Sequence, residues 1–127
     1  MANTTAFLRA LRTKINTIMP VYYDKAPSNA TAFPYAVINT PKVTDLAAGD
    51  LMLFYVDIWG DEKDEGTTVA LEEACDTLRN ALSGAVLAED GVFGAHIGFD
   101  SQNPLPDNEF DIAHRRLSLS ARIFYNH

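Results

Sequence analysis

The sequence predicts an α+β fold in which two helices pack on one face of a mostly antiparallel β-sheet, in the order α-β-β-β-α-β-β. Three observations support this prediction: two segments with apolar residues at helical spacing, a strongly apolar run at 51–59, and an alternating run at 112–125. With 127 residues, of which 47% are hydrophobic, the chain is expected to form a single domain over residues 1–127.

Each predicted helix has one apolar stripe. The first spans residues 5–19, between N-cap candidates at 3–5 and Pro20, and its stripe consists of Phe7, Leu8, Leu11, Ile15, Ile18 and Met19. The second runs from about Thr67 to Ser83 and is ended by Gly84, and its stripe consists of Val69, Leu71, Ala74, Cys75, Leu78 and Leu82.

The strands are predicted from apolar and β-branched runs. Short strands are expected at 21–23 and 35–39, and a glycine-rich strand is expected at 91–99. The run at 51–59 is apolar on both faces, which places it at the centre of the sheet. Residues 24–34, 60–66 and 101–111 are predicted loops, 47–50 is a predicted turn, and 86–87 is either a small strand or a helix exit.

The last strand, 112–125, alternates between two kinds of side chain. Leu117, Leu119, Ala121 and Ile123 are expected to face the core, and Arg116, Ser118, Ser120 and Arg122 are expected to face water or a partner.

The charge is unevenly distributed along the chain. The formal net charge is −7; residues 1–42 have a net charge of +4, residues 43–111 of −14 and residues 112–127 of +3. A net acidic chain argues against sequence-independent nucleic-acid binding over a broad face. Two interpretations remain: an acidic, soluble protein, or a subunit whose basic and acidic flanks suit head-to-tail contact with copies of itself.

The sequence contains no recognisable catalytic motif, and no enzyme activity, cofactor or metal is expected. The apolar run 51–56 is too short to span a membrane. Cys75 is expected to be a small buried hydrophobe in a reducing compartment, with cytoplasm as the default. The acidic run Asp61–Glu65 is interpreted as a solvated connection rather than a calcium loop.

Two histidines provide the alternative to a structural role. His96 and His114 lie on the last two predicted strands and could be neighbours if those strands pair. With Asp100 or Asp111 they would form a metal or ligand site, making the protein a small α+β ligand-binding domain or enzyme of unknown substrate. The other interpretation is two partly exposed strand histidines.

The elements also match a known pattern in their order. An amphipathic first helix leads to Val21-Tyr22-Tyr23, then to Ala26-Pro27 and to Phe33-Pro34-Tyr35-Ala36-Val37-Ile38. The strand Val56-Asp57-Ile58-Trp59 precedes a polar loop and a helix with Leu71, Leu78-Arg79 and Leu82. Arg116-Leu117-Ser118-Leu119 and Phe124-Tyr125 complete the series. Over essentially its whole length, the chain resembles the tail-completion (tail-terminator, head–tail joining) proteins of long-tailed bacteriophages and prophages.

This resemblance implies a structural virion assembly protein. Its copies would form a ring, commonly a hexamer, that caps the tail tube at the head–tail junction after assembly in the host cytoplasm. The implied partners are copies of itself, the tail-tube protein and the head-connector protein, with DNA only passing through the lumen. No membrane, small-molecule substrate, cofactor or catalytic residue is implied.

Two groups of residues are candidate contact sites in that role. The first is the polar face of the last strand, as a subunit interface: Arg116, Ser118, Ser120 and Arg122. A solvated sheet face is the alternative for these four residues. The second is a pair of acidic loops that would meet the tube or connector: Asp61, Glu62, Asp64 and Glu65 in one, Asp107 and Glu109 in the other.

Overall fold

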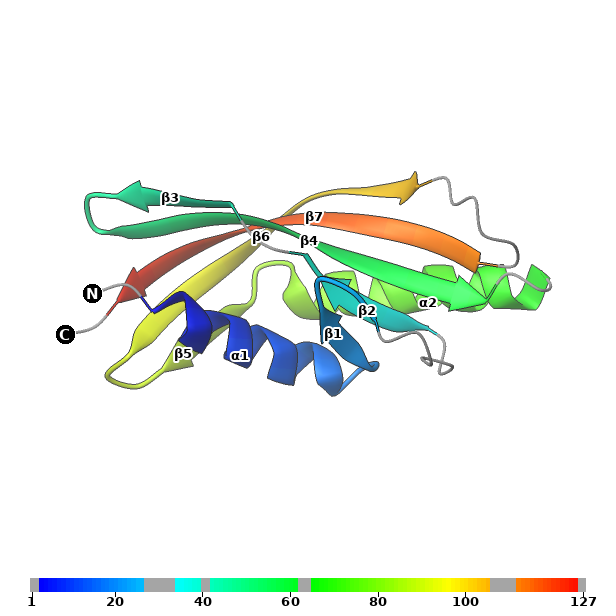
Figure 1. Cartoon of the computed structure of the whole chain (residues 1–127), viewed down its shortest axis with the longest axis horizontal. Helices are drawn as coiled ribbons and strands as arrows, with labels where there is room; N and C mark the ends of the chain where they lie inside the picture. The colour runs from blue at the N-terminus through cyan, green and yellow to red at the C-terminus, as the bar shows by residue number, and fades with distance from the viewer. Residues whose placement is uncertain (1–2, 27–33, 40–41, 62–64, 106–111, 126–127) are drawn as a thin grey trace.

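The computed structural model describes residues 3–26, 34–39, 42–61, 65–105 and 112–125, which form an α+β fold (Figure 1). Its elements, in chain order, are α1 (Thr4–Asn16), β1 (Val21–Tyr23), β2 (Tyr35–Ile38), β3 (Lys42–Leu46), β4 (Gly49–Asp61), α2 (Glu65–Leu82), β5 (Val86–Glu89), β6 (Phe93–Leu105) and β7 (Ile112–Tyr125). None of the helices in these ranges is long and apolar enough to cross a membrane.

The described strands form one sheet in the order β1-β2-β4-β7-β6-β5. β4 is central, as predicted: it pairs with β7 along one side, while β2 and β3 share its other side. β1 runs parallel to β2, and the remaining described pairs are antiparallel. The parallel pair makes the sheet mixed, which corrects part of the predicted antiparallel character. The element order is α-β-β-β-β-α-β-β-β, which corrects the predicted order α-β-β-β-α-β-β.

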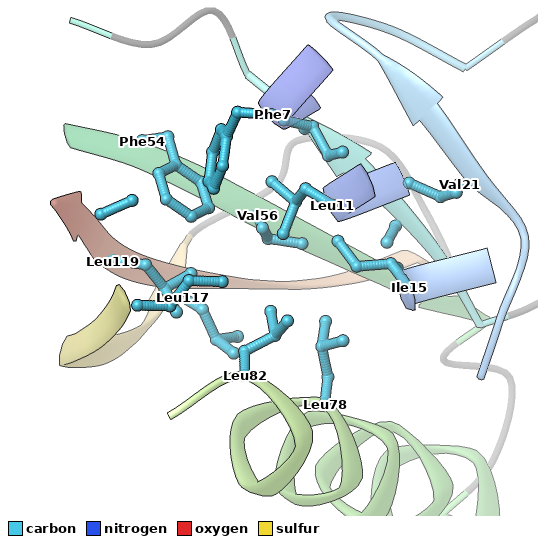
Figure 2. Packing of buried hydrophobic residues seen from close by; sticks show 14 of the residues in the cluster. Phe7, Leu11, Ile15, Val21, Phe54, Val56, Leu78, Leu82, Leu117 and Leu119 are labelled. Atoms are coloured by element: carbon cyan, nitrogen blue, oxygen red, sulfur yellow. The ribbon is translucent and has the colours of Figure 1, made fainter. Parts of the chain in front are cut away.

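Both helices pack on the same face of the curved sheet, the face that carries its buried apolar side chains (Figure 1). α1 contacts β1, β5 and β6, and α2 contacts β4, β6 and β7. The core lies between these two layers (Figure 2), where Phe7 of α1 packs edge-on against Phe54 of β4 and Phe93 of β6, with 6.1 Å between ring centroids in both pairs.

Most residues of the apolar stripes predicted for the helices lie in this core, but the prediction is wrong for Val69, which is 58% exposed. Fully buried side chains include Leu11 and Ile15 of α1 and Leu71, Leu78 and Leu82 of α2. Each contributes about 1.5–3 kcal/mol relative to an exposed side chain. Cys75 is also fully buried, as predicted, and burial raises the pKa of its thiol to about 12.

The first helix is shorter than predicted. Asn3 caps its start, since its side-chain oxygen accepts a hydrogen bond from the backbone N–H of Ala6 at 3.1 Å. The helix ends at Asn16, and the next three residues form a turn in which the backbone N–H groups of Ile18 and Met19 both donate to Ile15. Pro20 explains this ending, because a proline disfavours helical backbone in the residue before it.

Three strand predictions are corrected. β3 was not predicted, and the expected turn narrows to residues 47–48. Residues 86–89 form a strand, β5, rather than a helix exit. β6 continues through 101–105, which was predicted as loop, after a register irregularity between Phe99 and Ser101. Pro104 has no backbone N–H to donate to a neighbouring strand. It is tolerated in this half of β6 because β5 pairs only with residues 93–96, so no β5 residue needs a hydrogen bond from position 104.

Candidate functional site

The sheet has a second face, opposite the helices, that no described helix or strand covers; we call it the outer face. On β4 and β7 it consists of alternate residues: Leu51, Leu53, Tyr55, Asp57 and Trp59 of β4, and His114, Arg116, Ser118, Ser120, Arg122 and Phe124 of β7. Leu53 is 41% exposed, Tyr55 43% and Phe124 48%. β4 is thus apolar on both faces, as the sequence indicated, but only one of those faces is packed under the helices.

An ion pair between a buried carboxylate and a partly exposed arginine lies near one end of the outer face. Asp57 and Arg116 are direct partners across the β4–β7 ladder. The Arg116 side chain donates two hydrogen bonds to the Asp57 carboxylate, from Nε to Oδ1 at 2.9 Å and from Nη2 to Oδ2 at 3.1 Å. Asn39 donates a further hydrogen bond from Nδ2 to Oδ2. Asp57 is 4% exposed, so these bonds satisfy a carboxylate that is shielded from water.

The pKa of Asp57 reflects this arrangement. Burial alone would raise it, but the contacts with His114, Arg116 and Asn39 outweigh burial and lower the pKa to about 2. The same pair raises the pKa of Arg116 above its usual value, through its hydrogen bonds to Asp57. Both side chains are therefore charged at neutral pH.

Aromatic rings surround the ion pair. The guanidinium of Arg116 lies over the Tyr55 ring, 4.4 Å from its centroid. Trp59 stacks on His114, with 3.8 Å between centroids, and on Tyr35, with 6.4 Å. His114 Nε2 lies 3.4 Å from Asp57 Oδ2, but it is not aligned for a hydrogen bond. Arg116 is thus held in one orientation, between a buried carboxylate and an aromatic ring.

The structure places all four predicted interface residues on the outer face. The predicted alternation of β7 is confirmed: Leu117, Leu119, Ala121 and Ile123 are buried toward the helices. Ser118 and Ser120 are half-buried and Arg122 is exposed. Ser120 lies between Leu53 of β4 and Gly98 of β6. Because serine is small and glycine has no side chain, the outer face protrudes little at Ser120 and Gly98.

The predicted acidic loops fall mostly outside the described residues. Asp61 is the last residue of β4 and Glu65 the first of α2. Glu62, Asp64, Asp107 and Glu109 lie outside the ranges that the structure describes.

The two histidines do not form a site together. β6 and β7 do pair, but in a register that sets His96 opposite Arg122 and His114 opposite Leu105. His96 is therefore displaced from His114 by eight residues along β7, roughly 26 Å at about 3.3 Å per residue. Among the described residues, no group of three or more His, Cys, Asp or Glu side chains could hold a metal ion. The predicted proximity of the histidines is wrong because the sequence does not specify the register.

An open groove of about 490 Å³ lies beside α1, where this helix faces the ends of β1 and β2. Its described lining includes Arg9, Arg12, Tyr23 and Asp24. The Arg12 guanidinium lies 5.0 Å from the centroid of the Tyr23 ring, and the Tyr23 hydroxyl donates to the backbone oxygen of Leu8 at 2.9 Å. These contacts fix the walls of the groove, but this lining contains no nucleophile paired with a base.

Sequence reasoning found Arg116 but missed the residues that hold it. Asp57 was named only within the motif Val56-Asp57-Ile58-Trp59, and Asn39 only as the end of a short predicted strand. The available signal was Asp57 itself, because a carboxylate within a central strand requires a charged or hydrogen-bonding partner.

Comparisons with known proteins give the family. The model of the family described as tail completion protein gp17 matches residues 5–124. A comparison with curated proteins finds no match. A solved chain from the "virion of native gene transfer agent (GTA) particle" is 21% identical, with a TM-score of 0.63, over 94% of this chain and 90% of that chain. A second solved protein, named only by a sequence identifier, is 15% identical, with a TM-score of 0.72, over 100% of both chains.

At such low identities, the two solved structures show a shared fold. The family match is broader evidence, because it covers nearly the whole sequence. The chain therefore belongs to the tail completion protein gp17 family, and it is a structural protein of bacteriophage tail assembly.

Proposed function

We propose that this protein completes the phage tail as a ring of identical subunits, a hexamer when assembled, which caps the tail tube and offers the surface to which the head connector binds. Family membership supports the role in tail completion. The observation that supports self-assembly is the outer face, where several exposed apolar side chains and an oriented arginine are left uncovered by the described chain.

The exposed apolar side chains favour a contact on this face. Leu53, Tyr55 and Phe124 are each more than two-fifths exposed, on strands that are otherwise well packed. Contiguous apolar surface on a folded protein marks a site of association, because burying it in a partner releases the water that covers it.

Arg116 and Tyr55 add the residue types that dominate binding energies at protein interfaces. A mobile arginine loses side-chain freedom when it binds, and this loss weakens the contact. Asp57 and Tyr55 already fix the guanidinium of Arg116 in the folded subunit. Arg116 therefore loses less side-chain freedom when a partner binds. The polar residues Ser118, Ser120 and Arg122 continue the same surface along β7 and complete the proposed interface.

The remaining partners follow from the role. We infer that the acidic loops with Asp61, Glu62, Asp64 and Glu65 and with Asp107 and Glu109 contact the tail-tube protein or the head connector. The net charge of −7 suits a ring whose lumen lets DNA pass without retaining it. The proposed location is the head–tail junction of the virion, reached after assembly in the host cytoplasm, and the proposed role requires no catalysis, cofactor or membrane.

Capping of purified tail tubes tests this proposal. Tubes incubated with the protein are examined by electron microscopy for density at the tip, and their lengths are measured when tube protein is added afterwards. We expect tip-bound density and arrested growth. The variant Arg122→Glu is expected to reduce both, whereas Lys25→Glu, which makes the same charge change at an exposed residue after β1, is expected to have no effect. Bare tips and continued growth with the wild-type protein would contradict the proposal.

A further inference from the structure

We propose that the outer face of one copy packs on the exposed side of helix α2 of the next copy. This inference rests on the proposed self-association and names the second of the two surfaces that meet. The occupant of the outer face is thus a helix of a second copy, rather than the outer face of that copy.

The arrangement of layers makes such a contact heterologous. The helices cover one side of the sheet, and the outer face is the other side (Figure 1). A contact between opposite sides leaves one free surface of each kind on every pair, so further copies can add until the series closes into a ring. Two outer faces packed together would bury both surfaces and stop at a dimer.

The outer face has positive charges that its described neighbours do not balance. Arg122 is exposed, and its ladder partners are Leu51 on β4 and His96 on β6. Lys42 of β3 is also exposed, opposite Leu53. Asp57, an acidic residue of β4 on this face, is already bound by Arg116. The outer face therefore favours a partner surface that is acidic and partly apolar.

Helix α2 offers such a surface. Glu73 and Asp76 are both exposed and lie one helical turn apart. Val69, on the same helix, is 58% exposed. Glu72 is not available in the same way, because it accepts a hydrogen bond from Nε of Arg115 at 2.6 Å.

The other helix has the opposite charge. The sequence of α1 includes Arg9, Arg12 and Lys14 and contains no acidic residue. Packed against Arg122 and Lys42, α1 would place like charges together, which costs free energy at an interface. Charge therefore selects α2 over α1 as the helix that the outer face meets.

Concentration-dependent nuclear magnetic resonance tests which surfaces meet. Backbone amide signals of the full chain are followed from micromolar to millimolar concentration. We expect signals of outer-face residues on β4 and β7 to shift together with those around Glu73 and Asp76, along one common binding curve, while signals of α1 stay in place. Shifts confined to the outer face, or signals that do not depend on concentration, would overturn the inference.

A charge exchange provides an independent test. Asp76→Arg and Arg122→Glu are each expected to weaken self-association about tenfold or more, measured by sedimentation equilibrium. The variant with both substitutions is expected to recover association. Glu73→Arg serves as a second helix variant, and Asp90→Arg, at an exposed residue of the β5–β6 turn, is the matched control that should leave association unchanged.

The capping assay separates failure of this inference from failure of the proposed function. If Arg122→Glu impairs capping and self-association while Asp76→Arg and Glu73→Arg impair neither, the outer face is an interface but α2 is not its partner. If the wild-type protein does not cap tubes at all, the proposed function itself is wrong.

Discussion

Replacing Asp57 with asparagine should destabilise the protein, and the loss should depend on pH. Asp57 is the buried carboxylate that orients Arg116, and its pKa is lowered from 3.8 to about 2 in the folded protein. A carboxylate with a lowered pKa stabilises the folded state above the pKa of the unfolded chain. This stabilisation is complete above about pH 5 and is lost as the pH falls toward 2.

The expected magnitude follows from the two pKa values. One pKa unit corresponds to about 1.4 kcal/mol, so the fall from 3.8 to about 2 corresponds to about 2.5 kcal/mol at neutral pH. In Asp57→Asn the amide oxygen can still accept a hydrogen bond from Arg116, while the amide nitrogen replaces a carboxylate oxygen that accepted one. The change therefore removes the charge without adding a cavity.

Urea unfolding of the wild type and of Asp57→Asn, followed from pH 7 down to pH 2, measures this effect. We expect the variant to have a free energy of unfolding about 2.5 kcal/mol lower at pH 7, with the difference shrinking toward zero as the pH falls to 2 and below. Asp76→Asn, at an exposed residue, should change stability by less than about 0.5 kcal/mol. A difference between wild type and Asp57→Asn that stays constant with pH would refute this account of Asp57.

Three further predictions concern packing, backbone and the thiol. Leu78→Ala, at a fully buried residue, should lower the free energy of unfolding by about 2–5 kcal/mol, whereas Leu53→Ala on the outer face should cost less than about 1 kcal/mol and weaken self-association instead. Gly49→Ala should lower the melting temperature more than Gly91→Ala: both glycines have positive φ, but only at position 49 would the new Cβ lie 2.1 Å from a backbone oxygen of β7. Cys75 should resist a thiol reagent in the folded protein at neutral pH and react after unfolding in urea, as measured by absorbance; rapid reaction of the folded protein would contradict its burial.

The sequence predicted the parts of the fold whose side chains alternate between core and solvent. The stripes of α1 and α2 and the alternation of β7 each have a period that local geometry imposes, so they were identified without tertiary information. The central position of β4 followed from its apolar residues on both faces. What the sequence did not reveal is that one of those faces is left open.

The missed elements lack such a period. Four of the five residues of β3, including Lys42 and Asp45, are exposed, so it has no buried face to detect, and it is a strand because its backbone pairs with β4. The second half of β6 is polar and contains Pro104, yet its backbone pairs with β7. The parallel pairing of β1 with β2 is likewise a tertiary property that the residues of neither strand encode.

The candidate site was predictable to the same extent. Alternation in β7 placed Arg116 on the face opposite the core, which the structure confirms. Its partner Asp57 is 59 residues away in the sequence, and only the β4–β7 register brings the two together. The same lack of register information left open the alternative in which His96 and His114 are neighbours, which the structure contradicts.

The most direct test of the central claim is electron cryomicroscopy of purified tail tubes incubated with this protein. We predict a closed ring of subunits at one tip of the tube, in which the outer face of each copy, with Arg116 and Arg122, contacts α2 of the next copy. Tubes whose tips remain bare, or a tip-bound density in which the outer faces of all copies remain exposed to solvent, would contradict the account.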